Sequence, residues 1–131
     1  MKIRAVIIDD EKHSVETLQW KLEKCCPEVE IMQALLDPAA GLDYLKNHTP
    51  DLVFLDIAMP RMTGFDLLEA LETVPFDVIF TTAYDDYGIQ AIKFSALDYL
   101  LKPIQQPDLQ EAIRKFREKS VHQIPARQLA A

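Results

Sequence analysis

Five short runs of aliphatic and β-branched residues recur along the chain, and each has the length of a strand. They occupy residues 3–8, 29–35, 52–55, 76–82 and 96–101. The run at 29–35 alternates in part with polar residues, whereas the run at 52–55 is apolar without a break. Continuous apolar sequence is typical of a strand that helices cover on both faces. We therefore expect residues 52–55 to form a central strand of a parallel sheet.

Segments with a helical spacing of apolar residues separate these strands. In the first of them the apolar residues follow the i, i+3, i+7 spacing of one helix face, and Pro27 closes the segment. The same reasoning predicts helices over residues 14–26, 38–47, 65–71 and 86–94, and a last helix from about residue 107. Because strand and helix alternate five times, the sequence predicts an α/β fold. Its sheet is single, doubly wound, five-stranded and parallel, with helices on both faces.

The length and charge of the chain limit what it can be. A chain of 131 residues with 49% hydrophobic residues can fill the core of one domain. We assign residues 1–120 to this domain. Residues 121–131, where Pro125 interrupts the pattern, are expected to be a helix tail or a linker toward an output domain absent from this chain. The formal net charge of −7 repels phosphate backbones, so DNA is expected to bind only through such an output domain.

The two cysteines, Cys25 and Cys26, are neighbours in the sequence and cannot join distant parts of the fold. This arrangement fits a reducing cytoplasm. No apolar stretch approaches the roughly 20 residues of a membrane span, and the N-terminus lacks the layout of a signal peptide. We therefore expect a cytoplasmic chain that does not contact the membrane.

Polar side chains follow the predicted strands at their carboxyl ends, the edge where α/β sheets bind ligands. These side chains are Asp9, Asp10, Asp56, Thr82 and Lys102. Carboxylates that gather repel one another, and Mg²⁺ with a phosphoryl group is one remedy. Asp56 would then be the nucleophile, with a hydroxyl and an ammonium facing the transferred group. Each residue alone could also be a helix cap or a solvated surface group.

The sequence blocks around these strand ends form a set of motifs. They are Val6-Ile7-Ile8-Asp9-Asp10-Glu11, Asp56-Ile57-Ala58-Met59-Pro60, Met62-Thr63-Gly64-Phe65, Thr82-Ala83 and Tyr99-Leu100-Leu101-Lys102-Pro103. In this order they resemble the response regulator receiver (CheY-like) domain of two-component signal transduction, over residues 2–119. The segments 81–87 and 96–104 are similar to receivers of the LytR/AlgR type, which precede a LytTR DNA-binding domain that regulates transcription. The resemblance implies the flavodoxin-like strand order 2-1-3-4-5.

The resemblance also implies roles for single residues of a phosphoprotein. Asp56 would be the phosphoacceptor and would become an aspartyl phosphate. Asp10 would bind Mg²⁺ directly and Asp9 through water, with Asp56 and the backbone carbonyl of Ala58 completing the metal ligands. The only chemistry implied is the phosphorylation and dephosphorylation of the chain itself, so the protein would not be an enzyme in the ordinary sense.

A second set of residues would read the phosphorylated state. Lys102 would pair with the phosphoryl group, and its peptide bond to Pro103 would be cis. Thr82 would be the switch hydroxyl that moves toward the phosphoryl group, and Tyr99 the aromatic residue that turns inward. The implied partners are a sensor histidine kinase and the output domain. A homodimer through the face of the fourth helix, fifth strand and last helix is also allowed.

Two residues near the phosphoacceptor suggest a slow loss of the phosphoryl group. Ala58 has no polar side chain to position an attacking water, and Tyr84 is large enough to shield the site. Ala58 also bears on the enzyme alternative, a phosphatase of the haloacid dehalogenase type. Such enzymes place a general acid two residues after the nucleophile, where this chain has Ala58. A pseudo-receiver that works without phosphorylation is the other alternative.

Overall fold

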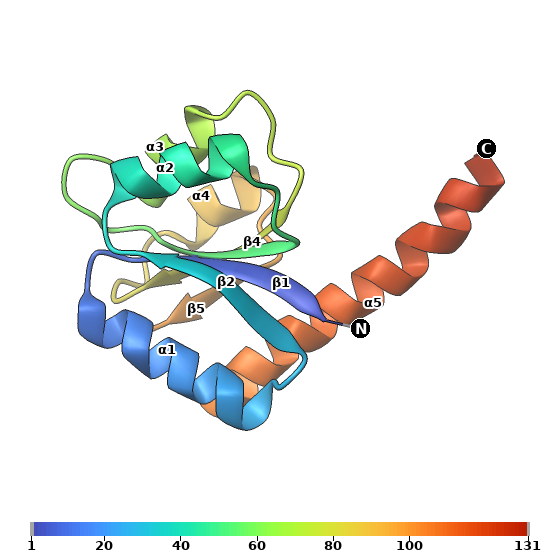
Figure 1. Cartoon of the computed structure of the whole chain (residues 1–131), viewed down its shortest axis with the longest axis horizontal. Helices are drawn as coiled ribbons and strands as arrows, with labels where there is room; N and C mark the ends of the chain where they lie inside the picture. Colours follow the sequence, from blue (N-terminus) through green and yellow to red (C-terminus); the bar gives the residue numbers. More distant parts are fainter. Residues whose placement is uncertain (1, 131) are drawn as a thin grey trace.

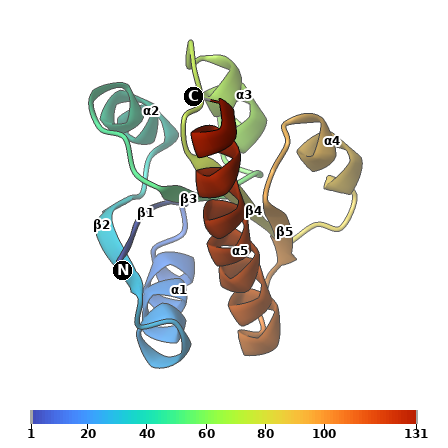
Figure 2. The ribbon, with the colours of Figure 1, turned by 90° about the vertical axis from the view of Figure 1, so that its right-hand side faces the viewer.

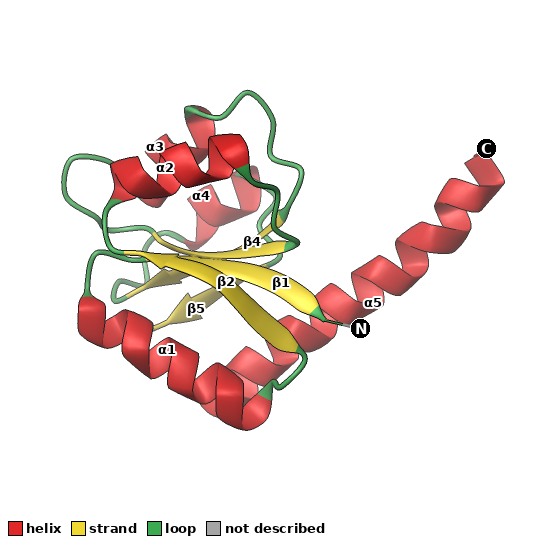
Figure 3. Cartoon of the chain, viewed as in Figure 1, coloured by secondary structure: helices red, strands yellow, loops and turns green. Residues whose placement is uncertain are grey.

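The computed structural model describes the backbone of residues 2–130 and the side chains of residues 2–119. Strands and helices alternate from the first strand to the last helix (Figure 3). The strands are β1 (Ile3–Ile8), β2 (Val29–Leu35), β3 (Leu52–Asp56), β4 (Asp77–Thr82) and β5 (Asp98–Leu101). The helices are α1 (Lys12–Cys25), α2 (Pro38–Asn47), α3 (Gly64–Glu69), α4 (Gly88–Lys93) and α5 (Gln106–Ala130). Within the described residues, no helix combines the length and apolarity needed to cross a bilayer.

The five strands form one parallel sheet in the order β2-β1-β3-β4-β5, which confirms the expected topology. Helices α1 and α5 cover one face, and α2, α3 and α4 cover the other (Figures 1 and 2). The core is accordingly split by the sheet into two clusters of buried residues. One cluster joins the sheet to α1 and α5, and the other joins it to α2, α3 and α4.

Strand β3 is the centre of this arrangement, as its apolar sequence predicts. All of its residues are buried, and the four apolar ones, residues 52–55, contribute alternately to the two clusters. Ile8 of β1 pairs with Leu55 on one side of β3, and Thr81 of β4 pairs with Asp56 on the other. Because the strands are parallel, this register brings the ends of β1, β3 and β4 to one edge of the sheet. Residues that directly follow these strands therefore share a site.

The observed bounds differ from the predicted ones mainly around α4. The sequence predicts a strand from residue 96, but β5 begins at Asp98. The N–H of Ala96 donates to the carbonyl of Ala91, so residue 96 closes the end of α4 instead of entering the sheet. Ser95 has a φ of 56°, which reverses the chain at this helix end. A backbone reversal of this kind leaves little trace in the hydrophobic pattern.

Helix α5 extends from Gln106 to Ala130 and projects beyond the sheet (Figure 1). The sequence predicts a helix tail or a linker over residues 121–131, where Pro125 interrupts the hydrophobic pattern, and the helical backbone of α5 continues through residue 125. The side chains of residues 120–131 lie outside the described residues. The domain boundary at residue 120 therefore stays a prediction.

Candidate functional site

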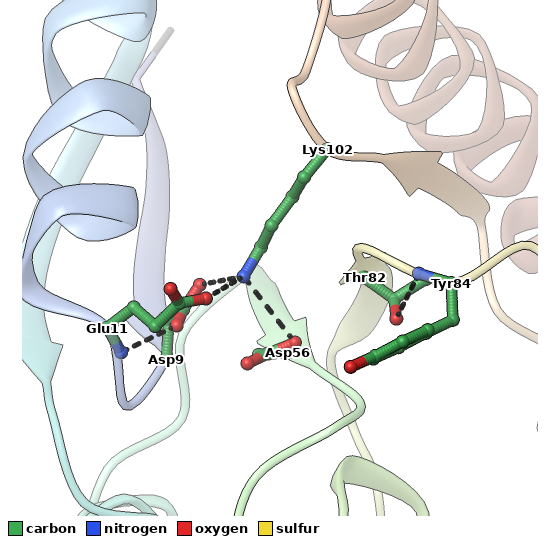
Figure 4. Close-up of polar contacts among 6 residues, drawn as sticks. All are labelled: Asp9, Glu11, Asp56, Thr82, Tyr84 and Lys102. Atoms are coloured by element: carbon green, nitrogen blue, oxygen red, sulfur yellow. Dashed lines mark hydrogen bonds and ion pairs between the residues drawn. The ribbon is translucent and has the colours of Figure 1, made fainter.

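Acidic residues from two strand ends meet at the carboxyl edge of the sheet. Asp9 directly follows β1, and Asp56 is the last residue of β3. Both are almost completely buried, with exposed fractions of 4% and 2%. A buried carboxylate needs a partner or a proton. The chain supplies that partner from β5, whose next residue is Lys102 (Figure 4).

The ammonium group of Lys102 lies among three carboxylates. Its Nζ atom is 2.9 Å from Oδ2 of Asp9, 3.4 Å from Oε1 of Glu11 and 3.7 Å from Oδ1 of Asp56. Burial acts to lower the pKa of Lys102, but the hydrogen bond to Asp9 and the nearby negative charges outweigh it and raise this pKa. Lys102 therefore stays positively charged and holds the carboxylates of β1 and β3 together.

One ammonium does not neutralise this cluster. Burial and the charge of Asp9 raise the pKa of Asp56 from 3.8 to about 7, against the opposing effect of Lys102. The charge and hydrogen bond of half-buried Asp10 raise it further. The surplus of negative charge favours a further positive group, and an all-oxygen ligand set suits a hard divalent cation.

The closest grouping of potential metal ligands includes a residue that the sequence analysis missed. Oxygen atoms of Asp9, Glu11 and Asp56 lie within 4.8 Å of one another. The N–H of Glu11 donates to Oδ1 of Asp9 at 2.9 Å, a local turn that sets Glu11 beside the cluster. The only signal in the sequence was that Glu11 continues the acidic run of Asp9 and Asp10. Ala58 lies in the loop that follows β3.

Gly64 lets this loop fold tightly beneath Asp56. The N–H of Gly64 donates to the carbonyl of Ile57 at 3.0 Å. A Cβ atom at Gly64 would stand 2.6 Å from the backbone oxygen of Asp56, closer than real Cβ contacts allow. Thr63 caps helix α3 at this point through reciprocal hydrogen bonds with Asp66.

Thr82 lies at the end of β4, buried, on the other side of Asp56 from Asp9 (Figure 4). Its Oγ1 atom accepts a hydrogen bond of 3.2 Å from the N–H of Tyr84. In the view of Figure 4, the Tyr84 ring points toward Asp56. The peptide bond between Lys102 and Pro103 is cis, the state that the resemblance implies.

Tyr99 does not reach the acidic cluster. Its hydroxyl group donates to the carbonyl of Tyr84 at 2.6 Å and accepts from the N–H of Tyr87 at 3.2 Å. Both partners belong to the loop that connects β4 with α4. The backbone of Tyr84 therefore touches both residues that the resemblance assigns to switching, since its N–H bonds Thr82 and its carbonyl bonds Tyr99.

Comparisons with known proteins identify the family of the chain. A family model described as the response regulator receiver domain matches residues 5–114. An uncharacterized response regulatory protein of Vibrio parahaemolyticus is 38% identical over 131 residues, which cover 98% of this chain and 53% of that protein. The sensory transduction protein LytT of Bacillus subtilis is 34% identical, over 88% of this chain and 48% of its own length. The chain spans about half the length of the curated relatives it matches.

A solved structure shows the same fold. The receiver domain of AraT, a response regulator from Geobacillus stearothermophilus, superposes with a TM-score of 0.81 at 31% identity and covers 94% of this chain and 98% of its own. The match to LytT agrees with the resemblance to receivers of the LytR/AlgR type, and these matches give no support to a phosphatase. The chain therefore belongs to the response regulator receiver family and is a receiver domain of a two-component response regulator.

Proposed function

We propose that Asp56 accepts a phosphoryl group from a phosphorylated histidine of a sensor kinase. The observation that carries this proposal is the burial of Asp56 at the end of β3, with Lys102 and the carboxylates of Asp9 and Glu11 around it. Burial and the charge of Asp9 destabilise the Asp56 carboxylate relative to an exposed one, which favours its reaction as a nucleophile, and Lys102 with a divalent cation would offset the negative charge that the phosphoryl group adds.

The transfer exchanges one bond for another. An oxygen of the Asp56 carboxylate attacks phosphorus, a new O–P bond forms, and the N–P bond of the phosphohistidine breaks. The imidazole nitrogen keeps the electron pair of that bond and takes a proton from solvent. Lys102 pairs with an equatorial oxygen of the phosphoryl group, and its position 3.7 Å from Oδ1 of Asp56 supports this role.

The donor set around Asp56 fits a divalent cation. We assign Mg²⁺ to Asp10 and Asp56 directly, to Asp9 through water and to the backbone carbonyl of Ala58. Mg²⁺ would supply positive charge that offsets the carboxylates and the incoming phosphoryl oxygens. Glu11, which lies within 4.8 Å of Asp9 and Asp56, is a further acid of this site.

The phosphorylated state is read by the loop between β4 and α4. Thr82 moves its hydroxyl toward the phosphoryl group and gives up the N–H of Tyr84, which frees that loop to rearrange around Tyr99. The changed surface is the face of α4, β5 and α5. Through it the chain acts on an output domain in the rest of the protein, or on a second copy.

We infer that this output domain is a LytTR DNA-binding domain that regulates transcription. Relatives named LytT, and the transcriptional regulatory protein BtsR of Escherichia coli, support this inference. Histidine kinases present their phosphohistidine in the cytoplasm, where we place the chain. The free thiols of Cys25 and Cys26 are consistent with that reducing compartment.

The experiment that tests this proposal follows both the protein mass and the phosphodonor. After incubation with acetyl phosphate and Mg²⁺, the wild-type chain should carry one phosphoryl adduct and consume little further donor. Asp56→Asn and a chelator should each abolish the adduct, whereas Asp51→Asn, a change at the opposite end of β3, should keep it. Rapid donor consumption without an adduct would support a phosphatase. No adduct on a folded chain would support a pseudo-receiver.

A further inference from the structure

The two cysteines form a close pair at the end of α1 that is remote from Asp56. Cys25 is the last residue of α1, and Cys26 caps the helix with its N–H bonded to the carbonyl of Leu22. Their Sγ atoms lie 3.6 Å apart, and neither is in a disulfide bond. Asp9 precedes the opposite end of the same helix, so the pair and the acidic cluster are separated by the length of α1 (Figure 1).

The spacing of the sulfur atoms suits a single bridging atom. Two sulfur atoms bonded to one atom at about 2.3 Å lie roughly 3.4–3.8 Å apart, from the narrow angle of a pyramidal centre to the tetrahedral angle, and the observed separation falls within this range. A direct disulfide suits the pair less well. Neighbouring Cα atoms are about 3.8 Å apart, whereas disulfides usually join Cα atoms 4.4–6.8 Å apart. Soft thiolate ligands select soft, thiophilic elements.

The described side chains around the pair offer no closed metal site of four protein ligands. Among the side chains that the structure describes, three or more His, Cys, Asp or Glu groups gather only at Asp9, Glu11 and Asp56. Glu28 is the nearest acid to the pair in the sequence, and it forms an ion pair with Arg117. The atom that bridges the two sulfur atoms must therefore already carry its third substituent, because no described side chain supplies one. A monosubstituted trivalent arsenical meets this requirement, because its arsenic atom carries one organic group and has two positions that thiols can occupy.

A groove gives such a ligand access to the thiols. It has a volume of about 520 Å³ and is lined by both cysteines and by residues of α5. Pro107 and Ile113 offer an apolar wall, and Arg114 and Arg117 stand at polar positions of the lining. Cys25 is half-buried and Cys26 is buried within the core, so entry is from the side of Cys25. The organic group of the arsenical would lie in the groove against α5.

We propose that Cys25 and Cys26 form a chelating site for monosubstituted trivalent arsenicals. In the reaction R–As=O and two thiols give R–As(S)₂ and one water. Two S–H bonds and the As=O bond break, two As–S bonds form, and the two protons leave with the oxygen. Arsenic stays trivalent and the sulfurs keep their oxidation state, so the step needs no oxidant.

The test uses phenylarsine oxide as the probe, with a phosphine reductant present and the intact mass of the native protein as the readout. Because the chain has two cysteines, a bis-thiol adduct can form only at this pair. The matched variant is Cys25→Ser. Its hydroxyl can still donate to the carbonyl of Lys21, as the Cys25 thiol does at 3.0 Å.

The wild-type chain should take one arsenical with loss of one water, keep it in excess monothiol and release it to a small dithiol. In Cys25→Ser the half-saturating probe concentration should rise at least about 100-fold, because the second bond is no longer intramolecular. An adduct that forms only in denaturant, or that survives monothiol in Cys25→Ser, would overturn the proposal. Phosphorylation of Asp56 is a separate readout, and the arsenical should leave it unchanged.

Discussion

At the scale of single residues, Asp56 should make the fold sensitive to pH. Burial and Asp9 raise the pKa of Asp56 from 3.8 to about 7. Between about pH 4 and 7 the folded chain therefore holds a proton that the unfolded chain has lost. Because the folded state binds more protons, the contribution of Asp56 to the free energy of unfolding falls as pH rises through this window.

Because the buried charge of Asp56 lowers the free energy of unfolding at high pH, Asp56→Asn should stabilise the protein in the absence of Mg²⁺. At pH 8 the free energy of unfolding should rise by about 1–2 kcal/mol, after allowance for solvent screening. Its dependence on pH between 4 and 7 should also become flatter than in the wild-type chain. Urea denaturation across this pH range measures both effects. A variant less stable than wild type at pH 8, with an unchanged pH profile, would contradict the assignment.

The residues beside Asp56 predict a long-lived phosphorylated form. Ala58 offers no polar group to a water that attacks phosphorus, and the Tyr84 ring points toward Asp56 (Figure 4). Ala58→Gln should position such a water and shorten the lifetime roughly tenfold. The decay of the phosphoryl adduct after donor removal measures it, with Ala58→Ser as a smaller polar control. An equal or longer lifetime in Ala58→Gln would count against this reading.

The sequence located most of this site, but not all of its contacts. Asp9 and Asp56 directly follow or end the largely buried strands β1 and β3, Lys102 follows the edge strand β5, and parallel strand ends meet at one edge of the sheet. Glu11 was missed because its position depends on a local turn in which its own N–H binds Asp9. The hydrogen bonds of Tyr99 to a loop likewise depend on backbone conformation, which hydrophobic spacing does not report.

At the scale of elements, the tight approach of α3 to β3 makes Gly64 irreplaceable. A Cβ atom there would meet the backbone oxygen of Asp56 at 2.6 Å, and backbone cannot move aside cheaply. Gly64→Ala should therefore lower the free energy of unfolding by about 1–3 kcal/mol. Gly88 is the matched control, because a Cβ atom there would meet nothing within 4 Å.

The control substitution should not destabilise the protein. Gly88 begins helix α4, so Gly88→Ala should be neutral or stabilising by up to about 1 kcal/mol. Urea denaturation of both variants gives the comparison. If the two substitutions changed the free energy of unfolding equally, the close contact with the backbone of Asp56 would not be the reason that residue 64 is a glycine.

Element type was easier to predict than element ends. The ranges of β1 (Ile3–Ile8), β2 (Val29–Leu35) and α2 (Pro38–Asn47) agree with the pattern, because runs of apolar and β-branched residues mark the strands and a proline marks the helix start. The end of α4 was not predicted. There a positive φ at Ser95 and the hydrogen bond of Ala96 to α4 decide where β5 begins.

At the scale of the whole molecule, Mg²⁺ should stabilise the fold. The acids come from β1 and β3, so they form one site only in the folded chain. A ligand that binds only the folded state adds about 2.7 kcal/mol to the free energy of unfolding at 100 times its Kd. Thermal unfolding with increasing Mg²⁺ measures this shift, and Asp10→Asn should remove most of it. An equal shift in Asp10→Asn would show that Mg²⁺ binds elsewhere than at the proposed ligands.

The molecule thus has two ends with different chemistry. The carboxyl edge of the sheet holds the acids and Lys102, and the opposite end of α1 holds the thiols of Cys25 and Cys26. Helix α5 packs against α1 and then projects from the domain (Figures 1 and 2).

If the chain works as we propose, Asp56, and no other acid of the cluster, forms an acyl phosphate. Borohydride reduces an acyl phosphate of aspartate to homoserine, so the modified position can be read by peptide mass spectrometry after labelling with acetyl phosphate and Mg²⁺. We expect homoserine at residue 56 alone, and none when a chelator replaces Mg²⁺. Homoserine at Asp9 or Asp10, or none in a folded chain with Mg²⁺ bound, would contradict it.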